Sequence, residues 1–148
     1  MANGNGNGHV TVKLREKAEK ILLSKYDRKL RKVEQKHDAL QEKTKKQVTA
    51  DLGLDKLLQK LKKEKEKCED LEQEIIIIAG ASYVSKSAIE SGEVSGRKID
   101  KEVRKRTKSK LDFSKEKERL ENLKDKLLEE LWLAGQSDEV KQILSRMD

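Results

Sequence analysis

The chain has 148 residues, of which 35 are Lys or Arg and 28 are Asp or Glu, so its formal net charge is +7. Only 34% of the residues are hydrophobic and 3% are aromatic, which excludes an ordinary globular domain built around bulky rings. The abundance of Lys, Glu and Leu is typical of long helices and coiled coils. We therefore predict an all-α fold, in which an elongated coiled-coil or helical-hairpin arm is joined to a small C-terminal helical unit.

The composition also argues against several kinds of site and location. No apolar run approaches the roughly 18 residues of a membrane span, and the Asn/Gly-rich start lacks the apolar core of a secretory signal. Cys68 is the single cysteine, so it forms no internal disulfide, and His9 and His37 lack the further ligands of a Cys/His zinc site. We expect an intracellular protein with no membrane contact, metal or cofactor.

The first predicted elements are a flexible tail and a long helix. Residues 1–12 begin with alternating Asn and Gly, and glycine is costly to order. From about Val12 to Ala50 the apolar spacing is helical. The a and d positions of its heptads, a stripe that we call a seam, are occupied by Tyr26, Leu30, Val33, His37, Leu40 and Thr44.

A second helical pattern begins after Gly53, which suits the residue just past a helix end. Its seam steps regularly through Leu54, Leu57, Leu61, Glu64, Cys68, Leu71, Ile75 and Ile78. Cys68 is interpreted as a small buried hydrophobic residue. The two patterns predict a coiled-coil helical hairpin over 13–78, while the alternative is one nearly continuous helix in a parallel dimer.

Residues 79–96 are rich in Gly and Ser and are predicted to form a hinge, with room for a short helix near 82–91. The segment from Ile75 to Ser87 has a Gly and a Lys-Ser pair at the spacing of a phosphate-binding loop. Ser85 replaces the second glycine of that loop, and too little chain follows for a parallel sheet. We therefore expect no bound nucleotide and no small-molecule substrate.

A basic block opens the last region, 97–148, which is predicted to be helical to Ala134. Its eight cations are Arg97, Lys98, Lys101, Arg104, Lys105, Arg106, Lys108 and Lys110. Phe113, Leu120, Leu127 and Ala134 then recur every seven residues. This layout is similar to that of basic-region leucine zippers, whose coiled coil places two basic helices in the major groove.

Gly96 stands where that family has its base-reading Asn, and Asp100 and Glu102 interrupt the basic block. We therefore do not assign the chain to that family. Non-specific binding to nucleic-acid phosphates needs only the cations. The other interpretations of the block are a solvated helix face and a surface that docks on an acidic helix.

The chain is expected to end in a short helix over 138–147, after a helix end at Gly135 and an N-cap at Ser137. This helix would cover Leu131, Trp132 and Leu133, although Trp132 could instead be exposed to a partner. The full set of predicted seam residues for a partner or a second copy is Leu30, Val33, Leu40, Leu54, Leu57, Leu61, Cys68, Leu71, Ile75, Leu120, Leu123, Leu127 and Trp132.

No catalytic set is recognisable, because neither His lies near a nucleophile and the carboxylates alternate with lysines at the spacing of surface ion pairs. We expect a non-enzymatic structural or adaptor protein that self-associates as a homo-oligomer or binds a protein partner, because narrow apolar stripes need cover. The alternative function is nucleic-acid association through the basic helix 97–110. That function would place the protein with the chromosome, in a nucleus or a nucleoid.

Overall fold

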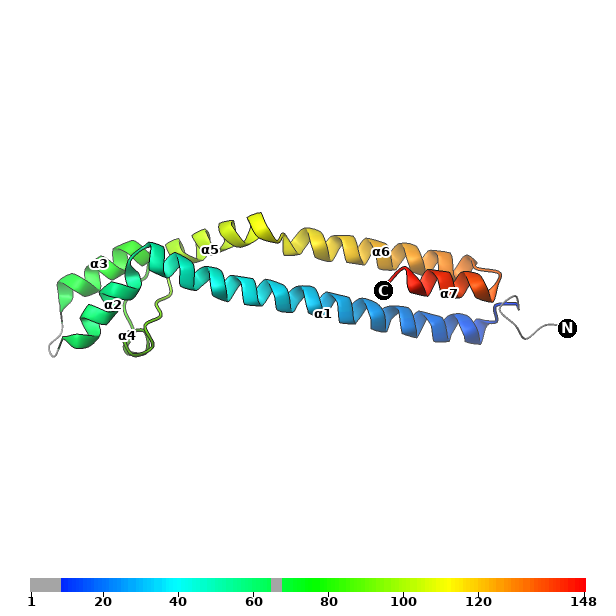
Figure 1. The fold of residues 1–148 in the computed structure, drawn as a ribbon, viewed down its shortest axis with the longest axis horizontal. Coiled ribbons are helices and arrows are strands. Elements are labelled where there is room, and N and C mark those ends of the chain that lie inside the picture. The colour runs from blue at the N-terminus through cyan, green and yellow to red at the C-terminus, as the bar shows by residue number, and fades with distance from the viewer. Residues whose placement is uncertain (1–8, 65–67) are drawn as a thin grey trace. The chain divides into compact units, whose positions relative to one another are not determined.

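Figure 1 shows the computed structural model of the chain, which describes residues 9–64 and 68–148. Within these ranges there are seven α-helices and no β-strand, although His9 and Gln136 form an isolated bridge. The predicted all-α fold class is confirmed. The helices are α1 (Val12–Asp51), α2 (Leu54–Lys63), α3 (Glu69–Ala79), α4 (Lys86–Ser91), α5 (Arg97–Lys110), α6 (Phe113–Leu133) and α7 (Ser137–Ser145).

The chain divides into two compact units. Unit 1 combines the chain up to Lys36 with Phe113–Asp148, and unit 2 is His37–Asp112. Helix α1 therefore supplies its first part to unit 1 and its last part to unit 2. The predicted regions 13–78 and 97–148 each contribute to both units.

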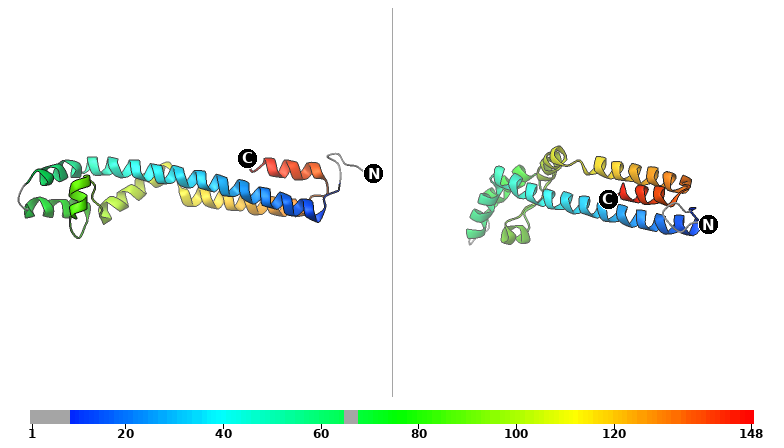
Figure 2. Two further views of the ribbon diagram at one scale, coloured as in Figure 1. Left: turned by 90° about the horizontal axis from the view of Figure 1, so that it is seen from below. Right: turned by 45° about the vertical axis from the view of Figure 1, so that its right-hand side comes forward.

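The core of unit 1 is formed by the first part of α1 together with α6 and α7. Ala18, Leu22 and Tyr26 recur every four residues and so lie on one face of α1. They pack in one cluster with buried residues of α6 and α7, and the two views of Figure 2 show α7 folded back beside α6. The buried residues of that side are Leu120, Leu127, Leu131, Ala134, Val140, Ile143 and Met147.

Part of the predicted flexible tail is ordered, which corrects the prediction for residues 9–12. Val10 is buried in the core of unit 1, and the Thr11 hydroxyl accepts a hydrogen bond from the Leu14 backbone N–H at 3.1 Å, as an N-cap does. Residues 1–8 lie outside the described residues. Helix α7 has Gln136 rather than Ser137 at its N-cap, so it begins one residue earlier than predicted.

In unit 2, the turn predicted at Gly53 is present, with a left-handed φ of 73°. This turn separates α1 from α2 and excludes the alternative of one continuous helix. The single helix predicted for 54–78 is wrong, because α2 ends at Lys63 and α3 begins at Glu69. Glu64, which follows α2, and Cys68, which precedes α3, both have extended backbones, and residues 65–67 lie outside the described residues.

Helices α2 and α3 pack against each other (Figure 1). Their buried faces, with Leu54, Leu58 and Ile75 at less than 2% exposure, share one core with Val48 of α1 and Ile99 of α5. Folding back therefore buries both apolar faces inside the chain. Among the predicted seam residues, Leu57, Cys68 and Leu71 pack at the margin of this core.

The helix predicted for 97–134 is also divided. Helix α5 ends at Lys110, its C-cap Leu111 has an extended backbone, and α6 begins at Phe113. Asp112 directly precedes α6, at the position where Asp is favoured because its carboxylate satisfies free backbone N–H groups. The short helix expected inside the hinge is α4, and the Ser85 hydroxyl caps it by accepting from the Ala88 N–H at 3.0 Å.

Candidate nucleic-acid interface

Helix α5 has one face in the core of unit 2 and the opposite face in solvent. Ile99, Val103 and Thr107 are 0%, 8% and 1% exposed and recur every four residues, so they define its buried face. The remaining positions are dominated by charged side chains. The apolar spacing within the basic block thus orients the helix and decides which cations are presented to solvent.

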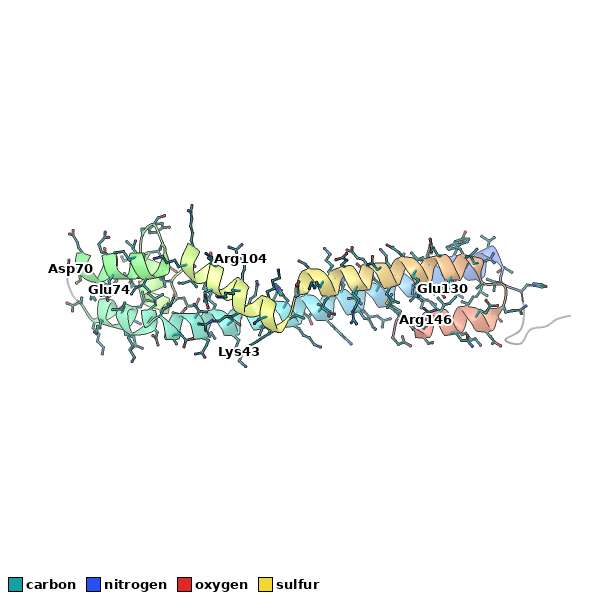
Figure 3. The ribbon with its side chains drawn as sticks, turned by 90° about the horizontal axis from the view of Figure 1, so that it is seen from above. Lys43, Asp70, Glu74, Arg104, Glu130 and Arg146 are labelled. Carbon is teal, nitrogen blue, oxygen red and sulfur yellow. The ribbon has the colours of Figure 1, made fainter. Side chains whose placement is uncertain are left out.

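Five cations share the solvent face of α5, and we call them the cationic face. Arg97, Lys101, Arg104 and Lys108 step by four, three and four residues, which keeps them on one side of a helix, and Lys105 lies beside them. All five are exposed. At 1.5 Å of rise per residue the stripe is about 16 Å long. Figure 3 shows the side chain of Arg104 on α5.

Two other members of the predicted basic site are bound inside unit 2. Arg106 donates from Nη1 to Asp51 Oδ2 at 2.7 Å and from Nε to Glu102 Oε1 at 3.0 Å. Lys98 donates from Nζ to the Ile77 carbonyl at 3.0 Å. The Arg106 contact joins α5 to α1, and the Lys98 contact joins α5 to α3. Both cations therefore stabilise the packing of α5 within unit 2. Lys110, the eighth predicted cation, is exposed at the last residue of α5.

The two acidic residues of α5 differ in their distance from the cationic face. Asp100 lies three residues after Arg97 and four before Arg104, so it borders this face. Glu102 is paired with Arg106. Asp100 lines a groove of about 960 Å³ that is formed within unit 2. The charged residues that line it, four acidic and three basic, are Glu42, Lys45, Lys46, Asp55, Glu93, Asp100 and Arg104. Within the cationic face, Arg104 lines this groove together with acidic side chains, and Arg97 lines a second groove with Glu93 and Asp100.

The Asp51–Arg106 pair shifts the pKa of both groups. Hydrogen bonds from Arg106 and then from Gln47 lower the pKa of Asp51 from its ordinary 3.8, because they stabilise the carboxylate. The hydrogen bonds that Arg106 donates to Asp51 and then to Glu102 raise the pKa of Arg106 itself, because they stabilise its charged form. Both side chains are more than one third exposed, so solvent screens the interaction and its contribution to stability is small.

We expect Asp51→Asn to lower the urea midpoint of unfolding slightly at neutral pH and to have no effect in strong acid. Because the folded-state pKa of Asp51 is depressed, its stabilising contribution is complete above the unfolded pKa and is lost as pH falls through the folded pKa. Urea titrations of both proteins from neutral to acid pH measure this convergence. A difference in midpoint that does not change with pH would contradict the assignment.

The predicted seam residues of unit 1 differ in exposure. Leu120 and Leu127 are buried, whereas Leu30, Val33 and Leu123 pack at the edge of the core. Trp132 is 42% exposed, and its indole Nε1 donates to Glu19 Oε1 at 3.3 Å. The neighbouring Leu133 is 85% exposed, so α7 covers Leu131 but leaves these two side chains open to solvent. In unit 2, Leu40 is half-buried, and Leu61 and Ile75 are buried.

The glycine and serine hinge supplies a second groove that the sequence analysis missed. It has a volume of about 610 Å³, and residues on either side of α4 line it, including Tyr83, Ser95 and Arg97. The segment before it, Glu69–Ala79, is helix α3. The strand that precedes a phosphate-binding loop is thus replaced by a helix, which agrees with rejecting that motif.

Two features are absent from residues 9–64 and 68–148, and both bear on the kind of site. These residues contain no group of three or more His, Cys, Asp or Glu side chains placed to hold a metal ion. No helix formed by them has the length and apolar character needed to cross a membrane. Comparison with family models, curated proteins and solved structures finds no match to this chain.

Proposed function

We propose that this chain is a non-enzymatic, intracellular structural or adaptor protein that binds the phosphates of nucleic acid through the cationic face of α5. The observation that carries the proposal is the sorting of charge on this helix. Five exposed cations occupy one face with Asp100 at its edge, while Glu102 and Arg106 are paired with each other on another side of the helix. Such a surface attracts a polyanion by releasing its counterions and needs no contact with base edges.

The length of the cationic face suits a nucleic-acid backbone. The cationic face presents five cations over about 16 Å, so it can neutralise up to about five backbone phosphates. Phosphate contacts position a protein on nucleic acid without reading sequence. We therefore expect binding that is strongly dependent on salt and largely independent of sequence.

The proposal is tested by removing three cations from this face. We expect the triple variant Lys101→Gln, Lys105→Gln, Lys108→Gln to bind a fluorescent oligonucleotide at least about tenfold more weakly at low salt. Each lost phosphate contact means that one fewer counterion is released from the nucleic acid on binding. Fluorescence anisotropy with single-stranded and duplex oligonucleotides of mixed sequence measures the affinity.

A matched triple variant controls for net charge. Lys17, Lys20 and Lys32 are exposed on the first part of α1 in unit 1, and their replacement by Gln removes the same charge. We expect this control to bind nearly as well as the wild type. Equal losses in the two triple variants, or no loss in either, would refute the assignment of the contact to α5.

Assembly with a protein partner or a second copy is a second candidate function, and the exposed end of α6 favours it. Trp132 and Leu133 lie next to each other at 42% and 85% exposure, and Trp is enriched at the centres of protein interfaces. The apolar seams supply less support than the sequence suggested, because most of their residues are covered within each unit. Sedimentation of the full chain would detect such a dimer.

A further inference from the structure

We propose that Tyr83 is a stacking platform for an unpaired base, so that the interface prefers single-stranded nucleic acid over duplex. This inference rests on the proposed function and adds the class of nucleic acid to it. The supporting observation is that the exposed ring of Tyr83 lines the same groove as Arg97, the first cation of the cationic face. A single strand crossing this groove would meet the ring and the cations together.

The exposure of Tyr83 is unusual within this chain. Its side chain is 71% exposed, whereas Tyr26, the other tyrosine, is 8% exposed and packs in the core of unit 1. Packing therefore does not explain why an aromatic residue occupies this position. An exposed ring offers a π-face to any base, and such stacking tolerates all sequences.

The loop that carries Tyr83 is held at both ends. On one side, the Gly80 carbonyl accepts a hydrogen bond from the Arg97 backbone N–H at 3.0 Å. On the other side, the Ser85 hydroxyl caps α4. The ring is thus displayed from a short, anchored segment, which reduces the entropy lost when a base stacks on it.

The groove places complementary groups around the ring. Arg97 lines it and also begins the cationic face, and Lys45 lines it while donating from Nζ to Ser95 Oγ at 3.3 Å. These two cations suit a phosphate, and the hydroxyls of the lining serines suit the sugar and the base edges. The volume of about 610 Å³ lies within the range of small-ligand pockets and so has room for a nucleoside.

Two acidic residues, Glu93 and Asp100, line the same groove and repel phosphate. We expect the phosphates of the strand to avoid these carboxylates and to lie beside Arg97 and Lys45 instead. The same carboxylates accept hydrogen bonds from the amino groups of bases, as Asp and Glu do with cytosine. In a duplex the bases are already stacked and paired, so Tyr83 contributes nothing to duplex binding.

The test compares Tyr83→Ala with Tyr83→Phe in the full chain. Because stacking on one aromatic ring is worth about 1–3 kcal/mol, we expect Tyr83→Ala to weaken binding of a mixed-sequence single strand by about fivefold or more. Binding of the duplex should be unchanged, and Tyr83→Phe should bind both like the wild type because it keeps the ring. Circular dichroism of the variants confirms that the helices are retained.

Failure of this inference is distinguishable from failure of the proposed function. If Tyr83→Ala binds the single strand as tightly as the wild type does, the stacking role is overturned. The same holds if its affinities for single strand and duplex fall equally. Neither result affects the assignment of the cationic face. If the wild type binds neither nucleic acid at low salt, both the inference and the proposed function are refuted.

Discussion

Replacing Leu127 by alanine is expected to lower the free energy of unfolding by about 2–5 kcal/mol. Leu127 is 0% exposed and lies in the core of unit 1 with Leu22 of α1 and Val140 of α7. The substitution removes buried apolar surface and leaves a cavity, and both effects favour the unfolded chain. Urea denaturation followed by circular dichroism measures the loss.

Leu133→Ala is the matched control, because Leu133 also lies on α6 but is 85% exposed. Its effect should stay within about 0.5 kcal/mol. The same titrations, repeated at two protein concentrations, show whether the seam of α6 is buried within one chain. A midpoint for the wild type that rises with concentration would indicate that a second copy covers this seam, contrary to the three-helix core of unit 1.

Gly96→Ala is expected to destabilise unit 2 by about 1–3 kcal/mol or more, as overpacking does. A Cβ at this position would lie 2.2 Å from the Ala79 carbonyl oxygen and 2.7 Å from its carbon. The φ of −174° is extended backbone that any residue adopts, so the cost is steric. Backbone cannot rotate away as a side chain does, and the end of α3 or the start of α5 must therefore move.

Gly135→Ala is the control for this substitution, since a Cβ there meets nothing within 4 Å. Its urea midpoint should be close to that of the wild type. Because Arg97 follows Gly96 directly and also binds the Gly80 carbonyl, Gly96→Ala should weaken single-strand binding as well. Equal midpoints for the two glycine variants would show that the chain at 79–97 is not packed as described.

Local signals in the sequence were sufficient for much of the fold. The apolar spacing and Gly53 predicted α1 and its end closely, and Gly and Ser predicted the irregular region that contains α4. The break between α2 and α3 was missed because the heptad spacing continues across it, with Glu64 and Cys68 in register. The wholly charged stretch 62–67 was the stronger signal, and Asp112 was the corresponding signal for the start of α6.

Periodicity identifies which face of a helix is apolar, but it does not identify what covers that face. Leu120 and Leu127 were therefore predicted to meet a partner, whereas in unit 1 they pack against the chain's own α1 and α7. For the candidate site, the sequence located all five residues of the cationic face. It did not separate them from Arg106, whose partner Asp51 is distant in sequence.

Tyr83 was missed for a related reason. Its proximity to Arg97 depends on a loop that closes between Gly80 and Arg97. No periodic pattern encodes such a closure, since it arises from the close approach of α3 and α5 at Gly96.

The most direct test of the account is the salt dependence of nucleic-acid binding by the wild-type chain. Binding of a duplex oligonucleotide is measured by anisotropy over a series of salt concentrations. Five phosphate contacts predict that the logarithm of the affinity falls against the logarithm of salt with a slope of about −4 to −5. A slope near zero, or no detectable binding at about 50 mM salt, would contradict the assignment of α5 as a phosphate-binding helix.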